Sequence, residues 1–192
     1  MKEKEKTADF YSSIKKDMLK SEHKYKELFE SVVTMLPENK ITSVLDLGCG
    51  IGSLVPFLNT SGYTNYLGVD FASNLTLAAS LRFSEYRFIT DDISSKVVSK
   101  MMSKYSVIIC LEVLEHMKND LELIKSLPSE KPFIFSVPTV MSKGHVRCFA
   151  SQDEVVARYQ EFLLFDKNKT IMKLGKPHHL MFLNKTTRKK HD

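Results

Sequence analysis

The chain has 192 residues, of which 43% are hydrophobic and 27% are charged. This length suits one domain with its own core, and the composition is that of a globular rather than a disordered protein. The net charge of +5 permits an anionic substrate or a nucleic acid without requiring either, and no apolar run is long enough to span a membrane.

Helical periodicity and short apolar runs alternate along the chain. Residues 8–36 carry apolar side chains at helical spacing, and Pro37 ends that region. Apolar runs then predict strands at 43–47, 65–70, 86–90, 105–111 and 132–137. Helices are expected between these strands at 53–60, 73–82, 95–103 and 119–127.

The pattern changes after Pro138. A helix is expected at 151–159, followed by strands at 161–166 and 178–184 with no helix between them. Strands that alternate with helices are typical of a parallel sheet, whereas two directly joined strands favour an antiparallel pair. The sequence therefore predicts an α/β fold, a doubly wound, mostly parallel, seven-stranded Rossmann-like sheet with an antiparallel C-terminal edge strand.

The three cysteines, Cys49, Cys110 and Cys148, form no C-x-x-C pair. Their odd number and their spacing support neither a disulfide framework nor a zinc ribbon. Residues 1–6 are highly charged, unlike the start of a secretory signal. A reducing, cytoplasmic setting is therefore expected.

The segment V-L-D-L-G-C-G-I-G-S-L at 44–54 is the most informative in the chain. A buried strand breaks into a loop with glycines at positions 48, 50 and 52, so a ligand can approach the backbone closely. A dinucleotide site requires the spacing G-x-G-x-x-G, and here the third glycine comes one residue early. The carboxylate of Asp46 suits a cationic group better than a pyrophosphate.

The motif D-L-G-C-G-I-G at 46–52 resembles the first motif of the class I S-adenosylmethionine-dependent methyltransferases, whose cofactor has a sulfonium, an amino group and no phosphate. The resemblance covers about residues 25–184 and implies S-adenosylmethionine as the cofactor. We expect one domain over 1–192, with a helical segment at 1–37, a cofactor-binding core at 38–184 and a basic tail at 185–192. The cofactor contacts implied in the first loop are Asp46, Gly48, Cys49, Gly50 and Gly52.

Acidic residues at the ends of the next two strands are candidates for binding the nucleoside. Asp70 lies 22 positions after Gly48, where a carboxylate accepts hydrogen bonds from ribose hydroxyls or caps the following helix. The resemblance places Asp92 on the adenine amino group and Ile93 against the ring. The alternative for Asp92 and its neighbour Asp91 is a role in a turn.

Three further side chains are candidates for cofactor contacts. Phe71 follows Asp70 and lines the adenine pocket or packs in the core. The resemblance places Leu111 and Glu112, at the end of the fourth predicted strand, beside the methionine part of the cofactor.

The segment E-V-L-E-H at 112–116 resembles small-molecule O- and N-methyltransferases of the ubiquinone-biosynthesis type. Histidine titrates nearest neutrality, so His116 and His145 are candidate catalytic bases, with polar structural roles as the alternative. Arg147 is suited to pairing with an anionic acceptor or to a solvated loop. His178 and His179 lie in a strand-like run and are expected to be structural.

A second interpretation requires a metal. E-x-x-E-H with a later histidine also resembles the small-RNA 3′-terminal 2′-O-methyltransferases, and implies a divalent ion on Glu112, Glu115, His116 and His145. The chain has no tryptophan, unlike that family near its later ligand. The sequence therefore favours a small-molecule acceptor and no metal.

Two other functions stay open. Nucleic acid is an alternative acceptor, and a cofactor-binding regulatory subunit without catalysis is an alternative to an enzyme. The chain has few insertions to cover a substrate, so a homodimer or a partner is expected to close the site. No membrane span is expected.

Overall fold

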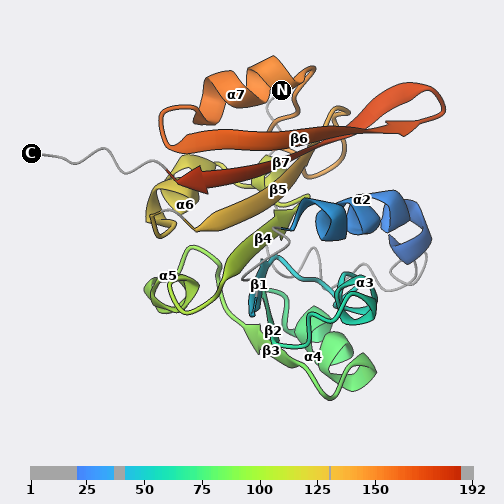
Figure 1. The fold of residues 1–192 in the computed structure, drawn as a ribbon, viewed down its shortest axis with the longest axis vertical. Helices are drawn as coiled ribbons and strands as arrows, with labels where there is room; N and C mark the ends of the chain where they lie inside the picture. The colour runs from blue at the N-terminus through green and yellow to red at the C-terminus, as the bar shows by residue number, and fades with distance from the viewer. Residues whose placement is uncertain (1–20, 37–41, 130, 187–192) are drawn as a thin grey trace, which may run out of the picture.

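A computed structural model describes residues 21–36, 42–129 and 131–186. A seven-stranded sheet crosses the molecule in the order β3-β2-β1-β4-β5-β7-β6 (Figure 1). Its strands are β1 (Val44–Leu47), β2 (Tyr66–Asp70), β3 (Arg87–Thr90), β4 (Val107–Leu111), β5 (Pro132–Pro138), β6 (Leu163–Lys173) and β7 (Lys176–Thr186).

The five strands β3, β2, β1, β4 and β5 are parallel to one another, whereas β7 is antiparallel to both β5 and β6. The predicted doubly wound, mostly parallel sheet with an antiparallel C-terminal edge is therefore confirmed. The adjacent strands β1 and β2 are buried along their whole length, as expected for apolar runs covered on both faces.

Helices cover both faces of the sheet. They are α2 (Ser21–Met35), α3 (Val55–Thr60), α4 (Ser73–Arg82), α5 (Lys96–Met102), α6 (Asp120–Ser126) and α7 (Gln152–Tyr159). Figure 1 shows α2, α3 and α4 on one face, with α5, α6 and α7 on the other. Each face has its own apolar core, with Leu28 and Leu58 in one and Met102, Ile124 and Tyr159 in the other.

Local sequence signals explain where several helices begin. The Ser95 hydroxyl accepts a hydrogen bond from the Val98 amide at 3.1 Å, and Ser151 caps α7 in the same way. Both are the N-cap interactions expected of serine. Pro56 lies in the first turn of α3, where backbone N–H groups have no partner within the helix, so the missing N–H of proline costs no hydrogen bond.

The last two strands are longer than predicted. Both continue into a hairpin that turns at Leu174 and Gly175, which have φ of 50° and 75°. Residues 166–170 are all polar, because β6 is an edge strand exposed to water, so their composition did not predict a strand.

Parts of the predicted N-terminal helical segment and basic tail, at 1–20, 37 and 187–192, lie outside the described residues. Within the part of the chain that is described, no helix is long and apolar enough to cross a membrane.

Candidate active site

A cavity of about 580 Å³ lies at the carboxyl ends of the parallel strands. Its walls come from the turn after β1, the end of β2, the turn after β3 and the segment after β4. This edge of a doubly wound sheet is where α/β folds bind their ligands. The predicted cofactor residues that line the cavity are Gly48, Gly50, Asp70, Phe71, Asp92, Ile93 and Glu112.

The glycine loop after β1 forms an open cradle in this wall. Its three glycines, Gly48, Gly50 and Gly52, all have positive φ, between 53° and 80°. A Cβ on Gly48 would lie 2.3 Å from Cγ2 of Val113, whereas a Cβ on Gly50 would meet nothing within 4 Å. The space at Gly50 therefore allows a ligand to approach the backbone.

Asp70 connects the end of β2 to the glycine loop. Its carboxylate accepts hydrogen bonds from the amides of Gly50 at 3.0 Å and Ala72 at 2.9 Å. Burial raises its pKa, and these amide donors oppose that rise. The carboxylate lines the cavity and keeps further lone pairs, so it is suited to accept hydrogen bonds from a ribose.

Asp46 lies at a different place from that expected of a cofactor contact. Its carboxylate is buried within the sheet and accepts a 2.7 Å hydrogen bond from the Tyr66 hydroxyl. Burial raises the pKa of Asp46 to about 7, although the Tyr66 hydrogen bond opposes the rise. Asp46 is not among the residues that line the cavity.

Three other residues that were predicted to contact the cofactor are also absent from the cavity lining. Cys49 packs on Gly68, where a Cβ would lie 2.7 Å from the Cys49 sulfur. Gly52 faces the rings of Phe83 and Phe88, and Leu111 packs beside the core under α2. These residues pack against other parts of the protein and do not contribute to the cavity lining.

Asp92 and Ile93 form the turn after β3. The Asp92 carboxylate accepts a 2.7 Å hydrogen bond from the Ser94 amide, which is the turn interaction considered as its alternative role. Asp92 is exposed, Ile93 is buried, and both line the cavity together with Ser94. The arrangement places a carboxylate and an apolar side chain side by side.

Glu112 is held in a strained conformation at the end of β4. Its φ of 55° is rare for a residue with a side chain. Its carboxylate accepts hydrogen bonds from the Ser136 hydroxyl at 2.7 Å and from Nδ1 of His179 at 2.8 Å. His178 continues this chain, with 2.7 Å between its Nδ1 and Nε2 of His179.

The contact between His179 and Glu112 was not predicted. The alternation along β7 indicates that one of the two histidines faces inward, but the sequence carries no signal that pairs it with a residue 67 positions earlier. Other cavity residues that were missed are Leu75, Ser94, Val113, Met117, Lys118 and Asn119. Most of them directly follow motifs that were recognised.

His116 and His145 lie together, as predicted from the loops that follow β4 and β5. Their ring centroids are 4.8 Å apart, and His116 also lines the cavity. Nδ1 of His116 lies 3.0 Å from the carbonyl oxygen of Gly144, so an N–H at Nδ1 leaves Nε2 as the basic nitrogen. Burial lowers the pKa of His116, which favours the neutral imidazole.

Glu115 lies behind these two rings. It is 1% exposed, and its Oε1 lies 3.6 Å from Nε2 of His116. Within the described part of the chain, neither of its carboxylate oxygens has a hydrogen-bond partner. Burial raises the pKa of Glu115 well above its usual value, and the nearby Glu112 adds to the rise.

Glu115, His116 and His145 offer ligand atoms that all lie within 4.8 Å of one another. A carboxylate and two imidazoles suit a borderline divalent cation. Glu112, the fourth residue of the metal-binding alternative, is not in this group and is bonded to Ser136 and His179.

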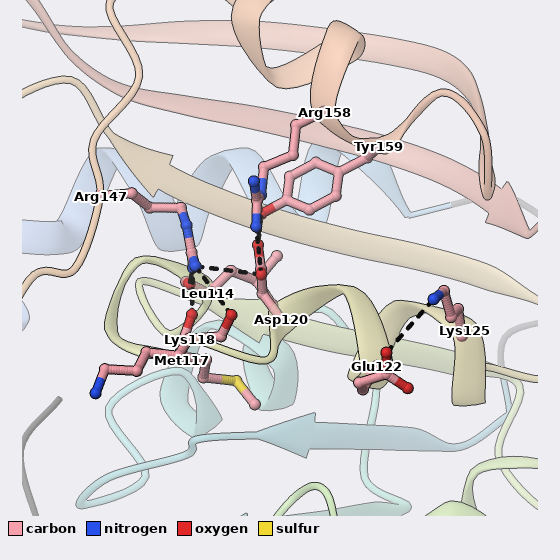
Figure 2. A network of polar contacts seen from close by, with 9 residues as sticks. All are labelled: Leu114, Met117, Lys118, Asp120, Glu122, Lys125, Arg147, Arg158 and Tyr159. Atoms are coloured by element: carbon pink, nitrogen blue, oxygen red, sulfur yellow. Dashed lines mark hydrogen bonds and ion pairs between the residues drawn. The ribbon is translucent and has the colours of Figure 1, made fainter.

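Arg147 faces inward rather than toward an acceptor. Figure 2 shows its guanidinium beside the backbone carbonyls of Leu114, Met117 and Lys118, and beside the carboxylate of Asp120. An arginine that donates to several fixed partners is a structural element of the loop. Arg147 is not among the residues that line the cavity.

A comparison with known proteins identifies the class of protein. Residues 20–161 match the methyltransferase domain family. The chain belongs to this family. The predicted class, an S-adenosylmethionine-dependent methyltransferase, is thereby confirmed, as is its fold.

This methyltransferase is similar to several others. It is 27% identical over 117 residues to the mitochondrial ubiquinone biosynthesis O-methyltransferase of Saccharomyces cerevisiae, which corresponds to 57% of this chain and 38% of that protein. The chain spans well under half the length of the curated relatives that it matches.

Two solved structures share its fold. The magnesium protoporphyrin IX methyltransferase of Synechocystis, crystallised with S-adenosylhomocysteine, has a TM-score of 0.70 at 15% identity, covering 94% of this chain and 97% of that chain. The methyltransferase domain of a bacterial Hen1 has a TM-score of 0.65 at 19% identity, covering 83% of this chain and 98% of that chain.

Proposed function

We propose that this chain transfers the methyl group of S-adenosylmethionine to an oxygen or nitrogen atom of a small-molecule acceptor. The observation that carries the proposal is one continuous cavity, with the glycine cradle and Asp70 in one wall and Glu112 and His116 in another. When bound, the cofactor supplies a methyl group activated by a sulfonium. The enzyme then has mainly to bind and align the two reactants.

The residues in the cavity fit the parts of this cofactor. The open space at Gly50 accepts a ligand against the backbone, and Asp70 is placed to receive ribose hydroxyls. Asp92 and Ile93 are suited to the adenine amino group and ring. The Glu112 carboxylate, held by Ser136 and His179, is suited to the positive charge of the methionine part.

Proton removal from a hydroxyl acceptor falls to His116 in this proposal. Burial lowers its pKa, which favours the neutral imidazole, and its Nδ1 is held by the Gly144 carbonyl. A neutral imidazole with one nitrogen fixed can accept a proton at the other. The resemblance to a ubiquinone biosynthesis O-methyltransferase supports a small acceptor with a hydroxyl group.

The test is a transfer assay with labelled S-adenosylmethionine and a panel of catechols, primary amines and short RNA. Labelled product from a catechol or an amine is expected, and His116→Ala should lower its rate about 10²–10⁴-fold. Product from RNA alone would contradict the small-molecule proposal. Binding of S-adenosylhomocysteine without transfer to any acceptor would favour the regulatory subunit.

Methylation of an RNA 3′-terminal ribose with a divalent metal is the second candidate function. The specific observation in its favour is the convergence of Glu115, His116 and His145, with both Glu115 oxygens buried and unbonded among the described residues. Bound metal would stabilise the charge that burial otherwise disfavours.

Calorimetry with Mn²⁺ tests the metal directly. Stoichiometric binding that is lost in Glu115→Gln, and retained in the control Glu122→Gln at an exposed position of α6, would favour the metal-dependent function. Unchanged transfer after chelation would favour the small-molecule function without a metal.

We also propose a cytoplasmic location and closure of the site by a second copy of the chain. The three cysteines are free thiols, which a reducing compartment favours. Sedimentation at increasing protein concentration tests the dimer.

A further inference from the structure

The cavity wall after β4 is built from a segment with little regular structure. Residues 113–119, called here the 113–119 turn, contain a single 3₁₀ turn at Leu114–His116. Five of its seven residues line the cavity, namely Val113, His116, Met117, Lys118 and Asn119. A wall without an extended helix or strand depends on other groups to keep its shape.

Arg147 supplies those contacts to the backbone of the turn. Its guanidinium donates to the carbonyl oxygens of Leu114 and Met117 through Nη1, and to that of Lys118 at 3.3 Å through Nη2. The planar guanidinium holds its donors in a rigid fork, so one side chain can bind several carbonyls at once. Lysine has no such geometry.

Asp120 orients the guanidinium of Arg147. Its fully buried carboxylate lies 3.2 Å from Nη2 of Arg147 (Figure 2). Arg158 donates two hydrogen bonds of 2.7 Å to the same carboxylate, and the Tyr159 hydroxyl donates a third at 2.7 Å. The end of α7 thereby fixes Asp120, and Asp120 fixes Arg147.

Two further hydrogen bonds join the segment that carries Arg147 to the same turn. The Val146 amide donates to the Glu115 carbonyl at 2.8 Å, and the Gly144 carbonyl lies 3.0 Å from Nδ1 of His116. The residues just before Arg147 therefore orient the imidazole that faces the cavity.

We propose that Arg147 is a positioning residue that holds the 113–119 turn in the shape that completes the cavity and orients His116. This inference rests on the proposed use of that cavity for S-adenosylmethionine. Arg147 acts through the turn and through His116, and it does not touch the reactants.

Two measurements on the full chain test this role. Calorimetry with S-adenosylhomocysteine should show an affinity about 10–100-fold lower in Arg147→Ala, because the misplaced turn no longer completes the site. The ¹⁵N spectrum of the imidazoles should show His116 as the Nδ1–H tautomer in the wild type and as a mixture of tautomers in the variant. His116→Gln assigns the signal.

Arg158→Ala is the matched control, because Arg158 also donates to Asp120 but reaches it from α7. It should lower the melting temperature and reduce the affinity less than Arg147→Ala does, because Tyr159 still donates to Asp120 and Arg147 keeps its own hydrogen bonds to the turn. Arg147→Lys keeps a positive charge beside Asp120 but lacks the several N–H donors of a guanidinium. It should therefore lose affinity as Arg147→Ala does. If the alanine variant does not fold, the lysine variant serves as the test.

Affinity within threefold of the wild type in both Arg147 variants, with the His116 tautomer unchanged, would overturn the inference. A wild type that does not bind S-adenosylhomocysteine would overturn the proposed cofactor site instead. The tautomer of His116 would still decide the role of Arg147 in that case.

Discussion

Asp46 shows how a motif residue can serve the fold. Its carboxyl group is buried beside Tyr66, and its pKa is raised to about 7 from an ordinary value near 4. The folded state therefore binds this proton more tightly than the unfolded state. Its stabilising contribution is complete below about pH 4 and is lost as the pH rises through about 7.

We predict that Asp46→Asn flattens the pH dependence of stability. Over that window the wild type should lose up to about 4 kcal/mol of unfolding free energy from this group, and the amide variant should not. Urea unfolding at pH 4 and pH 8 measures the difference. Parallel pH profiles for the two proteins would contradict the prediction. Glu115 has a raised pKa of the same sign, so some dependence should persist in the variant.

Asp70 has a double role, since the same carboxylate braces the glycine loop and faces the cavity. We predict that Asp70→Ala weakens binding of S-adenosylhomocysteine by about 1–3 kcal/mol, through loss of charge-assisted hydrogen bonds. Isothermal titration calorimetry measures this. Asp91→Ala, a neighbouring carboxylate outside the cavity lining, is the control and should bind normally. An equal loss in both variants would point to a general charge effect.

The glycine loop is the element whose chemistry was easiest to predict. Its glycines have distinct roles, because a Cβ at Gly48 would clash with Val113 whereas a Cβ at Gly50 would enter the open cavity. Sequence spacing identifies such a loop, but it does not show which glycine is required for packing and which for the ligand.

We predict that Gly48→Ala and Gly50→Ala separate these roles. Gly48→Ala should lower the melting temperature strongly, because the clash adds to the strain of a positive φ. Gly50→Ala should reduce affinity for S-adenosylhomocysteine out of proportion to its loss of stability. Gly62→Ala, with φ of 84° and open space around it, controls for strain alone. Equal stabilities for the Gly48 and Gly62 variants would refute the packing role.

The alternation of strands and helices was predictable because buried parallel strands are continuous apolar runs. The part of the β6–β7 hairpin nearest its turn was not predictable, since an edge strand exposed to water can be polar. Within the site, most residues inside the motifs were predicted, whereas several residues that directly follow them along the chain were missed. The pairing of Glu112 with His179, and the inward position of Arg147, depend on contacts between distant segments, which local patterns do not encode.

At the scale of the whole molecule, one sheet joins both apolar cores. Unfolding should therefore be a single cooperative transition, as expected for one domain. We predict that S-adenosylhomocysteine at 100 times its Kd raises the melting temperature by about 5–10 °C, which corresponds to about 2.7 kcal/mol for a chain of this size. Differential scanning calorimetry measures both. Two separate transitions, or an equal shift with NAD, would contradict the prediction.

The position of β7 between β5 and β6 also sets the order of events during biosynthesis. Glu112 emerges from the ribosome 67 residues ahead of His179, a delay of about 3–13 s at usual rates of synthesis. During that interval the Glu112 carboxylate lacks its contact with His179, and the edge of β5 that later pairs with β7 is unpaired. Glu112 is therefore the residue of the cavity lining that gains its last contact latest, and a chain released before β7 would expose the unpaired edge of β5.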